Sequence, residues 1–198
     1  MSLRKEILKA GRKMLLDEGI SNISMRKIAG EIDVSATSIY LHFRNKNHLL
    51  YTLIEESVEE LNCLIRDIVN TDRDPLAKME SIARTYVAFG LDRPQEYEVI
   101  FMLRPDEMPR YPKEKFRKAR EGYELLAEVI REGVDKGEMK EENPLRAAYA
   151  IWAQLHGIVS VVVNRRLDTR ISVNEFINHA IVHLIRGIQI NSHSQVTI

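Results

Sequence analysis

Residues 25–46 of the 198-residue chain read MRKIAGEIDVSATSIYLHFRNK. Over 25–32, the apolar residues recur at intervals of three and four, which is the spacing of one helical face. A second short helix is expected over 36–43, and the turn 33–35 separates the two. Two short helices joined by a three-residue turn predict a helix-turn-helix, and an all-α fold around it.

Both short helices are preceded by a serine. Ser24 and Ser35 are N-cap candidates, because a serine oxygen accepts a hydrogen bond from a free amide of the first helical turn. Within the second helix, the sequence predicts that Ile39, Leu41 and Phe43 pack it down onto the rest of the protein.

The other side chains of the second helix are small or form hydrogen bonds. A helix that enters the major groove of DNA needs short side chains near base edges, and the methyl groups of Ala36 and Thr37 could meet a thymine methyl. Ser38, Tyr40 and His42 can donate to phosphate oxygens. From the residues alone a second interpretation stays open, in which this is only a solvated face.

Composition favours a mainly helical, globular chain. Hydrophobic residues make up 44%, enough for a core, while 9 Gly and 6 Pro are too few for the turns of an all-β protein. Residues 1–50 hold nine Lys or Arg and five Asp or Glu, an excess of +4, so the rest of the neutral chain carries −4. A basic head fits a polyanion partner, although chance also produces an excess of this size.

The single cysteine, Cys63, excludes a disulfide within the chain and favours a reducing compartment. The charged N-terminus has no signal-peptide core, and no run approaches about 18 consecutive apolar residues. We therefore expect a cytoplasmic protein with no membrane span.

Helical periodicity continues along the chain, and no strand is expected. About nine helices are predicted, at 2–18, 25–32, 36–43, 46–70, 75–90, 94–103, 113–136, 144–166 and 172–187. The segment 104–112, RPDEMPRYP, is expected to be a loop. We predict a three-helix head with a helix-turn-helix at 1–48, a helical body for effector binding and dimerisation at 49–190, and a tail at 191–198, with helix 46–70 connecting head and body.

The run MRKIAGEIDVSATSIYLHFRNKNHLL, at 25–50, resembles the N-terminal signature of TetR-family transcriptional regulators. The preceding ILKAGRKMLLDEGISNIS matches as well, so the resemblance covers about residues 4–60. It implies phosphate contacts from Ser24, Arg26, Tyr40, His42 and Lys46, and a groove-facing group of Ala36, Thr37 and Ser38. Lys27 and Ser35 complete the predicted DNA-binding set.

The signature departs from the family at two positions. Asp33 stands where the family usually has Gly before the Val-Ser pair, and Asp tolerates a left-handed backbone better than most residues. Thr37 stands where a smaller residue is frequent, so the base preference can differ. His42 also has a second interpretation, in which it only braces the end of its helix.

Aromatic residues collect in the body, and a helical bundle can hold a ligand between facing helices. The predicted effector-binding residues are Tyr86, Phe89, Tyr97, Phe101, Tyr123, Trp152 and His156, with packing in a core as the alternative for each. The segment 147–167, AAYAIWAQLHGIVSVVVNRRL, resembles the Trp-His-Gly type of C-terminal domain found in part of the TetR family. This resemblance covers about 95–170 and implies effector binding in the body, while Gly157 permits close approach of another helix.

The last two helices, 144–166 and 172–187, carry broad apolar faces that fit either a core or a self-complementary dimer patch. In the TetR family, such helices form a homodimer interface. His179 and His183 have the i, i+4 spacing of zinc ligands, but a site needs more ligands, so no metal and no cofactor is predicted.

The sequence thus predicts a homodimeric transcriptional regulator that binds a palindromic operator in double-stranded DNA, and a repressor released by a small-molecule effector. The alternative is an all-helical ligand-binding protein or enzyme with a vestigial head. Against an enzyme, the sequence has no HExxH, GxSxG or phosphate-binding glycine loop.

Overall fold

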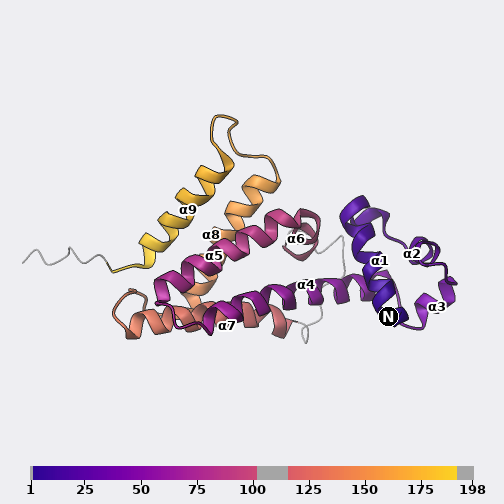
Figure 1. Ribbon diagram of the computed structural model, residues 1–198, viewed down its shortest axis with the longest axis horizontal. Coiled ribbons are helices and arrows are strands. Elements are labelled where there is room, and N and C mark those ends of the chain that lie inside the picture. The colour runs from indigo at the N-terminus through magenta and orange to yellow at the C-terminus, as the bar shows by residue number, and fades with distance from the viewer. Residues whose placement is uncertain (1, 102–115, 191–198) are drawn as a thin grey trace, which may run out of the picture. The chain divides into compact units, whose positions relative to one another are not determined.

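A computed structural model of the chain describes residues 2–101 and 116–190, and within these residues there is no strand. Their nine α-helices confirm the all-α fold class (Figure 1). The helices are α1 (Leu3–Glu18), α2 (Met25–Glu31), α3 (Ala36–Tyr40), α4 (Lys46–Val69), α5 (Pro75–Asp92), α6 (Pro94–Phe101), α7 (Phe116–Asp135), α8 (Pro144–Val163) and α9 (Val173–Ile188), and the 3-10 turn η1 (Ile20–Asn22) lies between α1 and α2. The predicted loop at 104–112 and tail at 191–198 lie outside the described residues.

The chain divides into two compact units. The first comprises residues 1–60 and 93–118, so α6 belongs with the N-terminal helices. The second comprises residues 61–92 and 119–198. The predicted head at 1–48 lies inside the first unit, which extends beyond it, and a functional boundary at residue 48 stays a prediction.

The first unit has its own apolar core, built from α1, α2, α3 and the start of α4. Its fully buried side chains include Ile7, Ile28, Ile39, Phe43 and Leu49. The predicted N-caps are confirmed. Ser24 Oγ accepts a hydrogen bond from the Lys27 amide at 3.1 Å, and Ser35 Oγ accepts one from the Ser38 amide at 3.1 Å.

The turn between α2 and α3 depends on a left-handed residue. Asp33 has a φ of 53°, and the next amide, that of Val34, donates to the Ala29 carbonyl at 3.0 Å. This backbone conformation is the one that glycine adopts without strain and that Asp adopts more readily than most residues. The Asp33 substitution therefore leaves the tight turn intact.

One packing prediction is wrong. Ile39 and Phe43 are buried as expected, but Leu41 is 81% exposed. Ile39 and Phe43 are four residues apart and share a helical face, whereas Leu41 lies roughly 200° around the helix from Ile39, at about 100° per residue. Ile39, Leu41 and Phe43 alternate with other residues in the sequence, and the prediction placed all three on one packed face. In a helix, this spacing of two residues turns Leu41 toward solvent.

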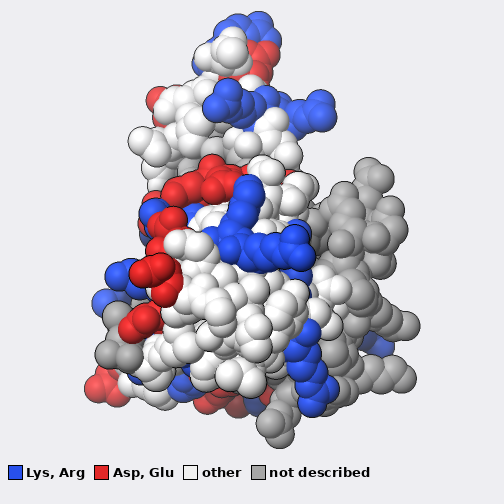
Figure 2. Space-filling model, turned by 90° about the vertical axis from the view of Figure 1, so that its right-hand side faces the viewer, with Lys and Arg blue, Asp and Glu red and all other residues white. Residues whose placement is uncertain are grey.

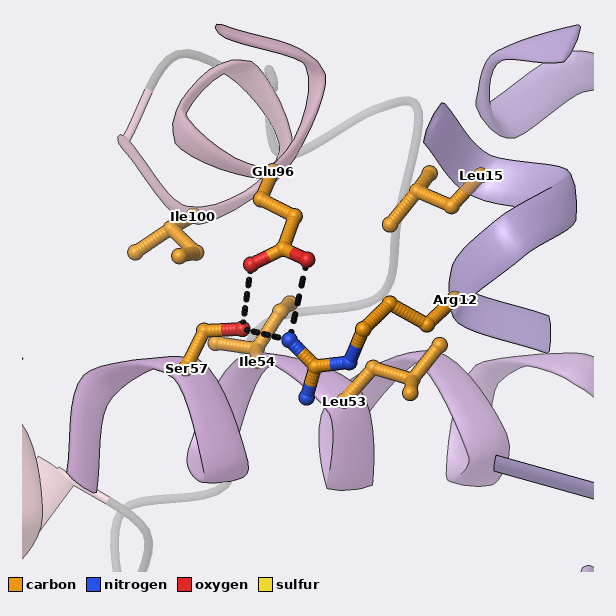
Figure 3. Close-up of a pocket in the computed structure, with 7 residues that line it drawn as sticks. All are labelled: Arg12, Leu15, Leu53, Ile54, Ser57, Glu96 and Ile100. Carbon is orange, nitrogen blue, oxygen red and sulfur yellow. Dashed lines mark hydrogen bonds and ion pairs between the residues drawn. The ribbon is translucent and has the colours of Figure 1, made fainter. Parts of the chain in front are cut away.

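A polar cluster ties three helices of the first unit together (Figure 3). The carboxylate of Glu96, on α6, accepts hydrogen bonds from Arg12 Nη1 on α1 at 2.9 Å and from Ser57 Oγ on α4 at 2.8 Å. Arg12 Nη1 also donates to Ser57 Oγ at 3.0 Å. The cavity beside them is small, about 10 Å³, which is close to the space of a single water molecule. The cluster is therefore a brace, with no room for a larger ligand.

The second unit is a helical bundle in which α5, α8 and α9 pack against one another. The amine of Lys78 on α5 donates to Glu132 on α7 at 2.8 Å, which joins α7 to the bundle. Asn143 caps α8 by accepting from the Arg146 amide at 3.0 Å, with Pro144 at the first helical position. This is the predicted start of that helix.

Among the helices that the structure describes, α8 is the one long and apolar enough to cross a membrane by length and composition. The sequence criterion of an unbroken apolar run did not select it, because Arg146, Gln154 and His156 interrupt the run. Only 33% of its apolar window is buried within the chain. Since core helices of helical proteins pass the same test, this feature assigns no membrane role.

Candidate DNA-binding surface and ligand site

The outward face of α3 carries the central part of the predicted DNA-binding set. Thr37 and His42 are exposed, and Tyr40 is 52% exposed, while Ile39 below them is buried. Figure 2 turns the side with α2 and α3 toward the reader: uncharged residues form much of the front, Lys and Arg side chains lie beside them, and Asp and Glu side chains lie along the left side. An uncharged surface with cations beside it suits base edges in a groove flanked by phosphates.

The serines of the set have structural partners of their own. Ser35 Oγ lies 2.9 Å from Ser38 Oγ, in addition to its capping bond, and Ser24 caps α2. Ala36, beside them, is half-buried. A hydroxyl group that accepts one hydrogen bond can still donate another, so capping and a phosphate contact are compatible.

The three predicted cations have different surroundings. Arg26 is exposed, and the amine of Lys27 pairs with Glu18 at 3.0 Å. The amine of Lys46 donates to the backbone carbonyl of Ile20 at 2.7 Å, and burial lowers its pKa. Lys46 therefore ties the start of α4 to η1, a role that its position in the sequence did not reveal.

Two further cations lie in the first unit near the recognition helix. Arg4 lies over the ring of Phe43, 5.2 Å from its centroid, and Arg44 is exposed just after α3. The Arg44 amide donates to His48 Nδ1 at 3.2 Å, which fixes the backbone between α3 and α4. Neither arginine belongs to the predicted DNA-binding set. Arg44 was recognisable as a cation one residue beyond the predicted recognition helix.

In the second unit, four rings of α7 and α8 form a continuous stack. Tyr123 and Tyr149 are stacked with centroids 4.0 Å apart, and the Tyr123 ring meets the Trp152 ring edge-on at 5.5 Å. Trp152 stacks in turn on His156 at 5.2 Å. Burial raises the pKa of Tyr123 to about 12 and lowers the pKa of His156. Both groups are therefore neutral at neutral pH, which suits contact with an apolar or planar ligand.

The seven predicted effector residues lie on four helices, α5, α6, α7 and α8. Tyr123, Trp152 and His156 belong to the stack, which Tyr149 completes, although Tyr149 was not in the predicted set. Tyr86 and Phe89 are buried on α5 in the second unit. The remaining two, Tyr97 and Phe101, are on α6 in the first unit, with ring centroids 4.9 Å apart.

His179 and His183 lie on α9 with ring centroids 4.5 Å apart, and both are exposed. Within the residues that the structure describes, no group of three His, Cys, Asp or Glu is placed to hold a metal ion. The pair thus lacks a third ligand from the described part of its own chain.

A helix-turn-helix whose second helix is exposed, next to a separate all-helical unit, defines a DNA-binding protein of the helix-turn-helix class. Two family models agree: "Bacterial regulatory proteins, tetR family" matches residues 7–52, and "Tetracyclin repressor-like, C-terminal domain" matches residues 79–184, more than half of the chain. The chain belongs to the TetR family of DNA-binding transcriptional regulators. Members of this family bind DNA and dimerise.

The similarity to known proteins extends over nearly the whole chain. The uncharacterized HTH-type transcriptional regulator YobS of Bacillus subtilis (strain 168) is 20% identical over 96% of this chain and 94% of its own length. A structure of a protein with unknown function from Rhodococcus sp. RHA1 superposes with a TM-score of 0.84 and 23% identity, covering 96% of this chain and 97% of the other. SmeT, the repressor of the Stenotrophomonas maltophilia multidrug efflux pump SmeDEF, superposes with a TM-score of 0.72 and 16% identity, covering 97% and 93%. Both structures share the fold.

Proposed function

We propose that the protein is a homodimeric, cytoplasmic repressor that binds a palindromic operator and leaves it when a small molecule occupies the second unit. The observation that carries the DNA-binding part is the exposed face of α3, where Thr37 and Tyr40 are open to solvent and Ile39 is buried, with His42 exposed just after the helix. The proposed contacts to DNA are those of the predicted set. Repression is supported by the shared fold with SmeT, which is itself a repressor.

The proposed dimer forms through α8 and α9. Large apolar side chains stay exposed on and beside these helices: Leu145, Tyr149, Ile171, Val173 and Val182. Gly157 has open space around it, since a Cβ built there meets nothing within 4 Å among the described residues. A partner helix can approach closely at such a position. Two copies would carry two recognition helices, which a palindrome places roughly 34–36 Å apart.

A single substitution tests this interface. Gly157→Ala should stabilise an isolated α8, because alanine favours a helix over glycine by about 1 kcal/mol. If a partner helix packs at Gly157, the added methyl group weakens the dimer, and sedimentation at decreasing protein concentration shows earlier dissociation. Gly30→Ala is the matched control, since its Cβ also meets nothing within 4 Å and it lies on α2. Equal dimer strength in both variants would contradict the interface.

The ring stack of Tyr123, Tyr149, Trp152 and His156 is the proposed effector site. For release, the effector must bind more tightly to the state that does not fit DNA, because a ligand with equal affinity for both states shifts no equilibrium. Trp152 is the single tryptophan of the chain, so its fluorescence reports on this site alone.

The decisive experiment combines two readouts on the full chain. Genomic fragments retained by the protein identify the operator, and planar aromatic compounds are then screened by Trp152 fluorescence. An effector should change this fluorescence and lower operator affinity, measured by DNA anisotropy, over the same concentration range. In Trp152→Phe, the fluorescence signal should disappear, and DNA release should require a higher concentration of the effector, because one ring of the proposed site is smaller. A compound that saturates the fluorescence change and leaves DNA affinity unaltered would refute the proposed coupling for this site.

A further inference from the structure

Leu41 is the most exposed of the large apolar side chains in the described part of the chain, at 81%. The others that are exposed, among them Tyr40 at 52% and Leu145 at 47%, retain more cover. Removing the apolar surface of a leucine from water is favourable. An exposed leucine beside a binding surface is therefore a candidate contact.

The backbone places Leu41 on the face that the recognition helix presents outward. Its amide donates to the Thr37 carbonyl at 3.2 Å, and its φ of −65° and ψ of −27° continue the helix by one residue. Residues four apart lie on one helical face, so Leu41 follows Thr37 along that face. The buried side of the same helix is occupied by Ile39, so Leu41 cannot turn inward.

The major groove offers one apolar group on its base edges, the C5-methyl of thymine. A leucine side chain gains nothing from a charged phosphate oxygen. The Cβ atoms of residues at i and i+4 are about 5–6 Å apart, which is more than one base step of about 3.4 Å. Thr37 and Leu41 can therefore face neighbouring base pairs.

We infer that Leu41 is a specificity-determining residue, which contacts a thymine methyl group in each half of the operator. This inference rests on insertion of α3 into the major groove. Contact with a methyl group neutralises no phosphate and releases no counterion, so it contributes to sequence preference without contributing to salt dependence. The lack of a contribution to salt dependence distinguishes Leu41 from the cations near it, which are proposed to contact phosphates.

The test uses the duplex that the wild-type protein selects from a random pool of DNA. Each thymine is replaced in turn by deoxyuridine, which removes only the methyl group. For wild type, deoxyuridine at one position of each half-site should weaken binding several-fold. Leu41→Ala should weaken binding to the unmodified duplex about 10-fold, equal to about 1.4 kcal/mol, and should be insensitive to deoxyuridine at that position.

Two controls complete the test. Leu64→Ala removes another exposed leucine, on α4, and should leave DNA binding unchanged. Arg26→Ala should reduce the slope of log affinity against log salt by about 1.8, because the dimer loses one phosphate contact from each protomer, whereas Leu41→Ala should leave the slope unchanged.

Wild-type affinity in Leu41→Ala, or deoxyuridine penalties that are the same in wild type and Leu41→Ala, would overturn the assignment of Leu41. If wild type selected no duplex at all, the DNA-binding function beneath the inference would fail instead.

Discussion

Replacing Glu96 by alanine should destabilise the first unit far more than replacing Glu56. Both carboxylates contact the same guanidinium group, that of Arg12, at 2.9 Å and 3.3 Å. They differ in burial: the Glu96 side chain is 4% exposed and that of Glu56 is 44% exposed. Each glutamate is thus the other's matched control.

The expected magnitudes follow from this difference. Removing one partner of a buried ion pair costs about 3–5 kcal/mol. Arg12 is 26% exposed and keeps Glu56 and Ser57 as partners, so solvent and these groups reduce the cost for Glu96→Ala to about 2–3 kcal/mol. Glu56→Ala removes an exposed contact, worth about 0–1 kcal/mol.

Hydrogen exchange measured by mass spectrometry suits this comparison, because it resolves the first unit from the second. A loss of about 2 kcal/mol corresponds to roughly 30-fold faster exchange of the protected amides. We expect that acceleration in α1 and α6 of Glu96→Ala, with Glu56→Ala close to wild type. Similar acceleration in the two variants, or none in Glu96→Ala, would refute the reasoning that the buried carboxylate holds α6.

Three smaller predictions test other features. Asp33→Gly should raise the free energy of unfolding by about 0.5–1 kcal/mol, measured in urea, because Asp33 has a φ of 53°; a destabilised variant would contradict the strain argument. Gly133→Ala should destabilise by about 1–3 kcal/mol, because the new Cβ would lie 2.5 Å from the sulfur of the buried Met139, and an unchanged thermal midpoint would show that Met139 moves aside freely. Burial lowers the pKa of His156 below its ordinary value of about 6.5, so the unfolded chain binds more protons there and stability falls as the pH drops from about 7.5 to 5.5. His156→Gln should lose less stability over that range in thermal unfolding, and an identical loss would mean that other groups cause it.

The sequence predicted the features that depend on neighbours along the chain. Helical periodicity and the serine caps located α2 and α3, because both signals act within one or two turns. Asp33 was correctly expected to permit the tight turn, since that depends on the backbone preference of one residue.

Features that join distant segments were not predicted. The bond from Lys46 to Ile20 and the cluster around Glu96 connect residues far apart in the sequence, and no local pattern marks such pairs. Leu41 was misplaced for a different reason, because alternating apolar residues were interpreted as one packed face.

The position of Glu96 bears on how this protein can be recombined with its relatives. A chimera that joined residues 1–60 to a foreign body would lack α6, leaving the guanidinium of Arg12 and the hydroxyl of Ser57 without the carboxylate that both contact. A DNA-binding unit that is transferred to another protein must therefore include residues 93–101 together with the N-terminal helices. The same requirement applies to natural recombination between family members.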